Sequence, residues 1–195
     1  MHHLNNLNLP DAEVYFDPQF YAKEESDLYF RQLMDEVNWK QESIKLFGKL
    51  LPMPRLTAWY GDKGYTYSGL LNEPQQWLPV LQELKKSVEK ASGQEYNSVL
   101  LNLYRTGQDS MGWHSDDEAA LGNEPSIASL SFGAERRFSF KHRSRKDIKP
   151  QSINLTNGSL LLMQGPTQHH WLHQVPKTAK PVQPRINLTF RKVVV

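Results

Sequence analysis

The chain has 195 residues, no cysteine and a formal net charge of only +2 at pH 7. This length suits one domain with a single core, and the lack of cysteine excludes disulfides, thiolate nucleophiles and cysteine-ligated metal sites. A mean hydropathy of -0.63 and the absence of a long apolar run argue against a membrane span. The N-terminal residues also lack the pattern of a secretory signal, so we expect a cytoplasmic protein, or a nuclear one in a eukaryote.

Two helices are predicted in the first half of the chain. The first is expected over Ser26 to Val37. Its rough apolar stripe consists of Leu28, Leu33, Met34 and Val37. The second begins at Pro79, which fits a first helical turn, and ends at Gly93. Its apolar positions at helical spacing are Leu81, Leu84, Val88 and Ala91.

After Gly93 the sequence changes to short β-type runs separated by turn residues. The runs are NSVLLNLYR, SIASLSF, RRFSFKH, QSINL, SLLLM, HHWLHQV and RINLTFRKVVV. Because no helices separate them, we predict an α+β, mainly β fold: a double-stranded β-helix (jelly roll) with two or more helices packed on one face. This single domain is expected over 23–195, after an irregular arm over 1–22, and the protein is expected to be a monomer.

A candidate metal site begins at His114-Ser115-Asp116. In an extended segment, side chains at i and i+2 point the same way, so the imidazole and the carboxylate would share one face. A third ligand must come from elsewhere, and His173 lies 57 residues after Asp116 in another strand-like run. Two histidines and one carboxylate leave open positions on iron(II), as oxygenases require. Further candidates for the third ligand are His142, His169 and His170.

Arg185 follows His173 by twelve residues and opens the run RINLTFR, in which polar and apolar residues alternate. The polar set is Arg185, Asn187, Thr189 and Arg191. Two arginines that point into one cavity need an anion, since an unpaired buried charge is costly. A small dicarboxylate would supply it, because arginine binds carboxylates in bidentate fashion. In isolation the run also fits an exposed edge strand, but the nearby HxD motif and His173 favour the dicarboxylate.

A second polar face supports this interpretation. In NSVLLNLYR, Asn102 and Tyr104 share one face of the expected strand, while Leu101 and Leu103 lie on the other. An amide and a phenol that project inward need hydrogen-bond partners. A bound 2-oxoglutarate would provide them.

At these residues the sequence resembles the AlkB family of nucleic-acid dealkylases. The similar stretches are PRLTAWYGDKGYTYSG, NSVLLNLYR, MGWHSDDEAALG, IASLSFGAERRFSF, HHWLHQVP and PRINLTFRKV. The joint occurrence of WHSDDE and PRINLTFR is specific, and the likeness spans roughly Leu46 to Val193. The resemblance implies an enzyme that uses Fe(II), 2-oxoglutarate and O2 to hydroxylate N-methyl groups of N1-methyladenine and N3-methylcytosine, with loss of formaldehyde. The implied partner is single- or double-stranded DNA, with RNA as a further candidate.

The resemblance also implies roles for individual residues. The implied catalytic residues and iron ligands are His114, Asp116 and His173. The implied 2-oxoglutarate contacts are Asn102, Tyr104, Arg185, Thr189 and Arg191, with Asn187 on the same polar face. Asp117 matches the position that contacts the exocyclic amine of the base, and Glu118 is expected to support it. A solvated turn is the alternative for these two acidic residues.

A methylated base in a duplex must be flipped out to meet the metal, and we expect a nucleotide-recognition lid at about 40–70. Tyr65 and Tyr67 can offer an aromatic wall for stacking. Phe47, Gly48 and Lys49 resemble the finger that fills the gap left by the flipped base, with a wedge and a phosphate contact. The alternatives are ordinary hairpin aromatics for the tyrosines and a core position for Phe47. Trp59 and Trp171 are assigned to packing.

Basic residues gather in two segments and are candidates for phosphate contacts, although any charged hairpin looks similar. They are Lys141, His142, Arg143, Arg145, Lys146, Lys149, Lys177 and Lys180. A continuous basic triplet after the distal-histidine segment is absent, which weakens the case for gripping a complementary strand. Two other functions stay open: a 2-oxoglutarate oxygenase acting on a protein or small molecule, and a cupin-like metal-binding module.

Overall fold

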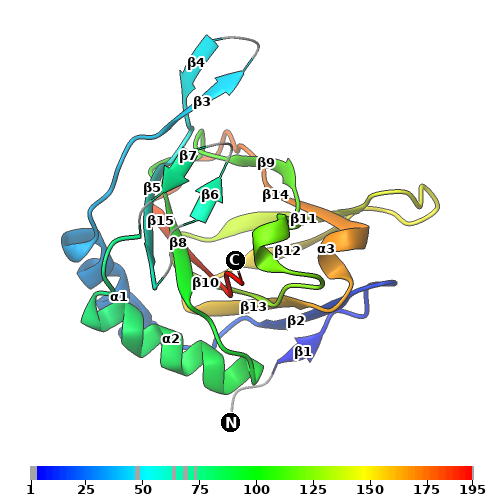
Figure 1. Cartoon of the computed structure of the whole chain (residues 1–195), viewed down its shortest axis with the longest axis horizontal. Helices are drawn as coiled ribbons and strands as arrows, with labels where there is room; N and C mark the ends of the chain where they lie inside the picture. The colour runs from blue at the N-terminus through cyan, green and yellow to red at the C-terminus, as the bar shows by residue number, and fades with distance from the viewer. Residues whose placement is uncertain (1–3, 47–48, 63–64, 68–69, 73, 195) are drawn as a thin grey trace.

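A computed structural model describes residues 4–46, 49–62, 65–67, 70–72 and 74–194. Two antiparallel sheets form the centre of the molecule, and two long helices cover the outside of the larger sheet (Figure 1). The described helices are α1 (Lys23–Glu36), α2 (Pro79–Ser92) and the short α3 (Thr167–His170), with a 3-10 turn at Ala119–Leu121. None of the helices in this part of the chain is long and apolar enough to cross a membrane.

The larger sheet has seven strands in the order β1-β2-β13-β10-β15-β8-β5. These are β1 (Asn5–Asn6), β2 (Glu13–Asp17), β5 (Leu56–Gly61), β8 (Ser98–Tyr104), β10 (Ile127–Gly133), β13 (Ser159–Gln164) and β15 (Arg185–Arg191). The smaller sheet has the order β12-β11-β14-β9. Its strands are β9 (Met111–His114), β11 (Arg136–His142), β12 (Gln151–Leu155) and β14 (Trp171–Val175). This mainly β arrangement with helices on one side confirms the predicted jelly-roll class.

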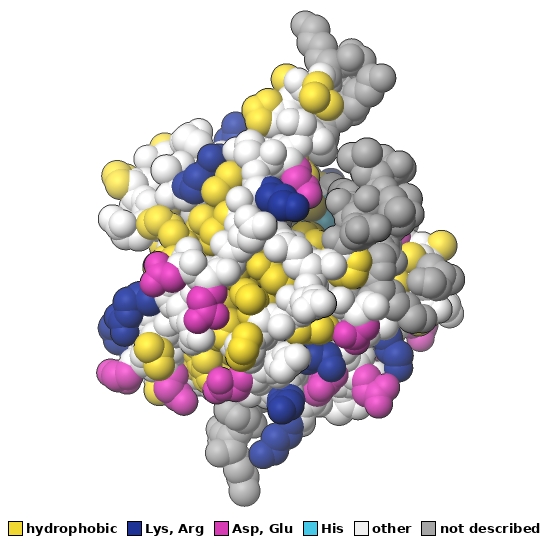
Figure 2. Space-filling model, turned by 60° about the vertical axis from the view of Figure 1, so that its left-hand side comes forward, with side chains coloured by type: hydrophobic (Ala, Val, Ile, Leu, Met, Phe, Trp, Pro, Cys, Tyr) yellow, Lys and Arg dark blue, Asp and Glu magenta, His cyan; other side chains and the backbone are white. Residues whose placement is uncertain are grey.

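Two hairpins stand apart from the two large sheets, in and just after the segment at about 40–70 where a lid is expected. They are β3 (Ser43–Leu46) with β4 (Lys49–Pro52), and β6 (Tyr65–Tyr67) with β7 (Leu70–Asn72). The β3–β4 hairpin projects from the body and carries apolar side chains (Figures 1 and 2). On β4, Leu50 is 73% exposed and Leu51 is 44% exposed.

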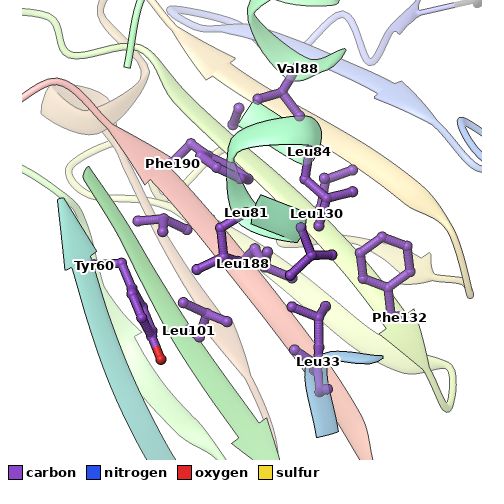
Figure 3. Packing of buried hydrophobic residues seen from close by; sticks show 14 of the residues in the cluster. Leu33, Tyr60, Leu81, Leu84, Val88, Leu101, Leu130, Phe132, Leu188 and Phe190 are labelled. Carbon is purple, nitrogen blue, oxygen red and sulfur yellow. The ribbon is translucent and has the colours of Figure 1, made fainter. Parts of the chain in front are cut away.

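One core layer lies between the larger sheet and the helices. Leu81, Leu84 and Val88 of α2 point at the sheet, toward residues of β10 and β15 such as Leu130 and Phe190 (Figure 3). The helix follows the prediction closely: Pro79 occupies its first turn, and Gly93 ends it with a φ of 66°, a conformation that glycine adopts without a steric penalty. A second core layer between the two sheets contains Phe138, Phe140, Leu161, Met163 and Trp171.

The prediction for α1 is wrong at one position. Leu28 is 56% exposed, whereas Leu33 is fully buried and Val37 nearly so. Five residues at about 100° each place Leu28 roughly 140° around the helix from Leu33, which is outside a single apolar stripe. The helix also begins earlier than expected, at Lys23.

The expectation of an irregular arm over 1–22 is wrong for the residues that form β1 (Asn5–Asn6) and β2 (Glu13–Asp17). Residues 13–17 form β2, which pairs antiparallel with β13 through contacts such as Tyr15 with Leu162. Val14 is fully buried, and Trp171 donates its indole N–H to the Pro10 carbonyl at 2.8 Å. The short run EVYFD carries only a weak strand pattern, and its conformation is set by the open edge of β13.

Candidate metal centre and adjoining cavity

Two histidines far apart in the sequence become direct cross-strand partners. His114 ends β9 and His173 lies in β14, and the two residues face each other in the antiparallel register. Their ring centroids are 4.3 Å apart. Asp116 lies just beyond the end of β9, and its Oδ2 is 3.6 Å from His173 Nε2. One ligand atom from each of the three residues lies within 4.8 Å of the others, so this group can hold one metal ion.

Electrostatics keep these ligands in the forms that bind a metal. Burial lowers the pKa of His173 to about 3, so its imidazole is neutral at pH 7. His114 donates Nδ1–H to the Gly112 carbonyl at 2.9 Å, which leaves its Nε2 lone pair free. Burial raises the pKa of Asp116, but nearby positive charge, chiefly that of Arg191, outweighs this and holds the pKa below its ordinary value.

Asp116 is fixed by two partners. Arg191 on β15 donates an N–H to Asp116 Oδ1 in a buried ion pair. Gln168 is fully buried in α3 and accepts the Asp116 backbone N–H at 2.9 Å through its side-chain oxygen. A carboxylate anchored from its main chain and one oxygen has its other oxygen available for a cation.

The other histidine candidates for the third ligand lie apart from this group. His169 and His170 belong to α3 rather than to the strand expected there, and His169 bonds to Asn123 at 3.1 Å. His142 is buried against Trp171, with ring centroids 5.1 Å apart. Within the described ranges, the group of His114, Asp116 and His173 is the one set with metal-ligand geometry.

The arginine-bearing strand β15 is central and buried throughout, so it is no exposed edge. Its apolar residues Ile186, Leu188 and Phe190 pack toward the helices. Arg185 is 1% exposed, donates Nη2–H to Ser131 Oγ at 2.8 Å, and lies over the ring of Tyr104 with its Cζ 5.2 Å from the centroid. Burial lowers its pKa to about 10. Among the described residues, its Nε and Nη1 have no hydrogen-bond partner.

A cavity of about 110 Å³ opens beside the metal ligands. The predicted residues that line it are His114, Asp116, His173, Asn102, Tyr104, Asn187, Thr189, Arg191 and Glu118. Arg185 packs on Tyr104, its register partner in β8, rather than lining the cavity itself among the described residues. Asn187 makes only internal bonds there, donating to Ser129 Oγ at 2.7 Å and to the Leu130 carbonyl at 2.9 Å and accepting from Thr189.

Buried guanidinium N–H groups that lack a partner need an acceptor with negative charge. Arg185 has two such groups, and Arg191 Nε is a third in the described structure. A polar cavity lined by Arg191 and the three metal ligands, with Arg185 packed on the lining residue Tyr104, therefore fits a small carboxylate that also binds the metal. The residues present suit Fe(II), because imidazole and carboxylate are its usual protein ligands in oxygenases.

Sequence reasoning missed several residues on the cavity wall, among them Glu42, Arg55 and Trp59. Arg55 is 6% exposed and donates Nε–H to Asn102 Oδ1 at 2.7 Å. Trp59 was assigned to packing but also lines the cavity. The signal was present, because Arg55 just before β5 and Thr57 and Trp59 within it alternate with Leu56, Ala58 and Tyr60, as expected when one face of an extended segment differs from the other.

The two acidic residues after the metal carboxylate point in different directions. Asp117 was expected at the base, but it pairs with Arg143 at 2.5 Å and its side chain is 43% exposed. Glu118 lines the cavity instead, and its Oε2 is buried with no hydrogen-bond partner in the described residues. The two carboxylates therefore have different surroundings in this structure, because the chain turns after Asp116 into the 3-10 turn that begins at Ala119.

The candidate phosphate-binding hairpin is partly neutralised. Arg145 pairs with Asp147 at 2.9 Å and lies 3.6 Å from Asp11. His142 is buried and so presents no surface charge. Lys141 is exposed and lies over the ring of Trp113, with Nζ 4.8 Å from the centroid. Of the lid residues, Phe47 and Gly48 lie outside the described residues, and for Lys49, Tyr65 and Tyr67 only the backbone is described.

A jelly roll that brings two imidazoles, a carboxylate and buried arginines to one cavity defines the class of mononuclear metal oxygenases that bind a carboxylate co-substrate. Comparison with known proteins agrees. The model of the 2OG-Fe(II) oxygenase superfamily matches residues 13–191. The chain is 46% identical over 190 residues to "Alpha-ketoglutarate-dependent dioxygenase alkB homolog 3" of Bos taurus, covering 93% of this chain and 66% of that protein. It is 41% identical over 185 residues to "DNA oxidative demethylase ALKBH2" of Homo sapiens, covering 89% and 71%.

The chain therefore belongs to the AlkB family of 2OG-Fe(II) oxygenases. The metal and co-substrates of this family are Fe(II), 2-oxoglutarate and O2. The chain spans 66% of the length of the alkB homolog 3 protein of Bos taurus. A solved structure, "The structure of OsALKBH1", shares the fold with a TM-score of 0.64 over 92% of this chain and 96% of that chain, at 16% identity.

Proposed function

We propose that the protein is an iron(II)- and 2-oxoglutarate-dependent dioxygenase that removes methyl groups from N1-methyladenine and N3-methylcytosine in DNA, and that it also acts on RNA. The observation that carries the proposal is the convergence of His114, Asp116, His173 and Arg191 on one cavity. With iron bound, 2-oxoglutarate and O2 supply the oxidation that adds one oxygen atom to the methyl carbon, while the other oxygen atom enters succinate as CO2 leaves.

We assign the protein's contribution to binding and orientation. His114, Asp116 and His173 would hold the metal on one face and leave the opposite face open. Arg185, next to Tyr104, would bind the distal carboxylate of 2-oxoglutarate through its two free N–H groups. Arg191 would serve the metal end, where it already holds Asp116.

Recognition of the base is assigned to the open side of the cavity. N1-methyladenine and N3-methylcytosine carry a positive charge, so a carboxylate on the wall favours them over the unmodified bases. Glu118 supplies this carboxylate, since its Oε2 is buried without a partner among the described residues. Trp59 lies on the same cavity wall, where an aromatic side chain can pack against a flipped base.

Access to the duplex is assigned to the β3–β4 hairpin. Its exposed Leu50 and Leu51, together with the predicted wedge at Phe47, provide apolar surface that can enter a base stack. The name of one relative, a DNA oxidative demethylase, supports the same substrate class. The separated lysines and the partly neutralised hairpin near Arg145 favour single strands alongside duplexes.

A substrate panel tests the proposal. Purified protein would be given Fe(II), 2-oxoglutarate and oligonucleotides that differ only in one methyl group, as single-stranded DNA, duplex DNA and RNA. Loss of the methyl group from the base would be followed by mass spectrometry. We expect demethylation that disappears in His173→Ala and persists in the matched control His169→Ala, because His169 lies apart from the metal ligands. Turnover of 2-oxoglutarate with a peptide or small molecule, without any demethylation, would contradict the proposal.

A further inference from the structure

A second buried arginine shares the ring on which Arg185 lies. Arg136, at the start of β11, is 3% exposed. Its Cζ lies 5.6 Å from the centroid of the Tyr104 ring, and that of Arg185 lies 5.2 Å from the same centroid. Neither arginine takes part in an ion pair within the described part of the chain. Two guanidinium groups therefore meet at one phenol without a carboxylate of their own.

Arg136 is held rigidly by the main chain. It donates Nη1–H to the Thr106 carbonyl at 3.2 Å, and Nη2–H to the carbonyls of Asp109 at 2.9 Å and Pro176 at 2.8 Å. The first two carbonyls belong to the loop between β8 and β9, and the third follows β14 directly. These three strands carry Tyr104, His114 and His173. A single planar side chain thus ties together the ends of the strands that build the cavity.

The loops that Arg136 joins are packed closely. The Thr178 N–H bonds to the Gly107 carbonyl at 2.9 Å, and a Cβ placed on Gly107 would lie 2.5 Å from the Thr178 carbonyl oxygen. The Asp109 carboxylate raises the pKa of Arg136 by its charge, although burial lowers that pKa more. Asp109 is itself paired with Arg105 at 2.7 Å. Arg136 is therefore fixed in place while its positive charge stays only partly compensated.

We infer that Arg136 is a positioning and specificity-determining residue for the distal carboxylate of 2-oxoglutarate, an inference that rests on the co-substrate assignment proposed above. It holds the Tyr104 ring, against which Arg185 packs, and it adds a second buried positive charge at the same end of the site. Charges in such surroundings act over longer distances than in water. A co-substrate with a carboxylate at this end relieves the repulsion between the two arginines, whereas one with a methyl group there does not.

The test compares 2-oxoglutarate with 2-oxopentanoate, which has a methyl group in place of the distal carboxylate. Calorimetric titration of the 195-residue protein loaded with Mn(II), a redox-inert probe, gives Kd for each. The Kd for 2-oxopentanoate divided by the Kd for 2-oxoglutarate measures how much the distal carboxylate contributes to binding. We expect Arg136→Met to lower this ratio about tenfold by weakening 2-oxoglutarate alone. Arg136→Lys, which keeps the charge but not the planar fork, should lower it less and covers the case in which the Met variant fails to fold.

Arg137→Met is the matched control, since Arg137 lies on the opposite face of β11 and bonds only to Ser152 among the described residues. This variant should keep the wild-type ratio. An unchanged ratio in Arg136→Met, or a parallel weakening of both ligands, would overturn the inference, because a merely structural residue affects both ligands alike. A wild-type protein that binds 2-oxoglutarate no better than 2-oxopentanoate would instead overturn the proposed co-substrate site. The two failures are therefore distinguishable.

Discussion

Arg185 should lower the stability of the ligand-free protein and strengthen the binding of 2-oxoglutarate. Its guanidinium is buried, and two of its N–H groups lack partners among the described residues. Burial lowers the Arg185 pKa from its ordinary value to about 10, which corresponds to about 3 kcal/mol against the buried charge. Replacing Arg185 removes this cost but also removes its hydrogen bond to Ser131 at 2.8 Å, which is worth about 1.5 kcal/mol or more. Arg185→Met should therefore leave the ligand-free protein at least as stable as the wild type.

The same variant should bind 2-oxoglutarate much more weakly. Two charge-assisted hydrogen bonds to a buried carboxylate are worth at least about 3 kcal/mol together, so the Kd should rise roughly a hundredfold or more. Denaturant unfolding without ligand and calorimetric titration with 2-oxoglutarate measure the two effects on one sample. A variant that unfolds much more easily and binds 2-oxoglutarate normally would refute the reasoning, since Arg185 would then be an ordinary structural residue.

Further predictions concern the metal ligands, the wedge and the base pocket. His173→Ala should lose tight Fe(II) binding in equilibrium dialysis, while His169→Ala keeps it. In metal-free protein the pKa of His173 lies at about 3, below the 6.5 of an unperturbed histidine. The unfolded chain therefore binds more protons than the folded one between these pH values. The free energy of unfolding should fall by about 1 kcal/mol as the pH drops from 7 to 5.5. Denaturant titration of the wild type and of His173→Gln at both pH values checks this loss, which the variant should not show. Phe47→Ala should slow repair of methylated duplex DNA roughly tenfold to a hundredfold and that of the same single strand far less, and equal losses with a lower melting temperature would indicate a core residue. Glu118→Gln should slow turnover of a cationic methylated base about tenfold or more in steady-state assays, and a larger loss in Asp117→Asn would reverse this assignment.

Local patterns in the sequence predicted what depends on local geometry. The polar face of β15 and the Asn102–Tyr104 face of β8 follow from the two-residue period of strands, and both faces meet the cavity or its neighbours. Helix α2 follows from Pro79, its apolar spacing and Gly93. These features can be predicted without knowing which strands pair, because the spacing of apolar residues along the chain indicates which side of an element is buried.

Features that depend on tertiary pairing could not be read in this way. The register that sets His173 opposite His114 depends on the pairing of β9 with β14, two strands that are far apart in the sequence. The run EVYFD becomes β2 only because β13 offers it an edge. Asp117 and Glu118 are equivalent in sequence, and a turn of the backbone sends one toward Arg143 and the other to the cavity. Arg136 gave no signal at all, because its partners are backbone carbonyls of distant loops.

The central claim is that one cavity couples oxidation of 2-oxoglutarate to removal of a methyl group from a nucleic-acid base. The most direct measurement is simultaneous quantification of succinate and formaldehyde with an N1-methyladenine oligonucleotide and its unmethylated twin. We predict equimolar succinate and formaldehyde with the methylated strand, and little of either with the twin or with His173→Ala. Succinate formed at the same rate with both strands, without formaldehyde, would contradict the claim.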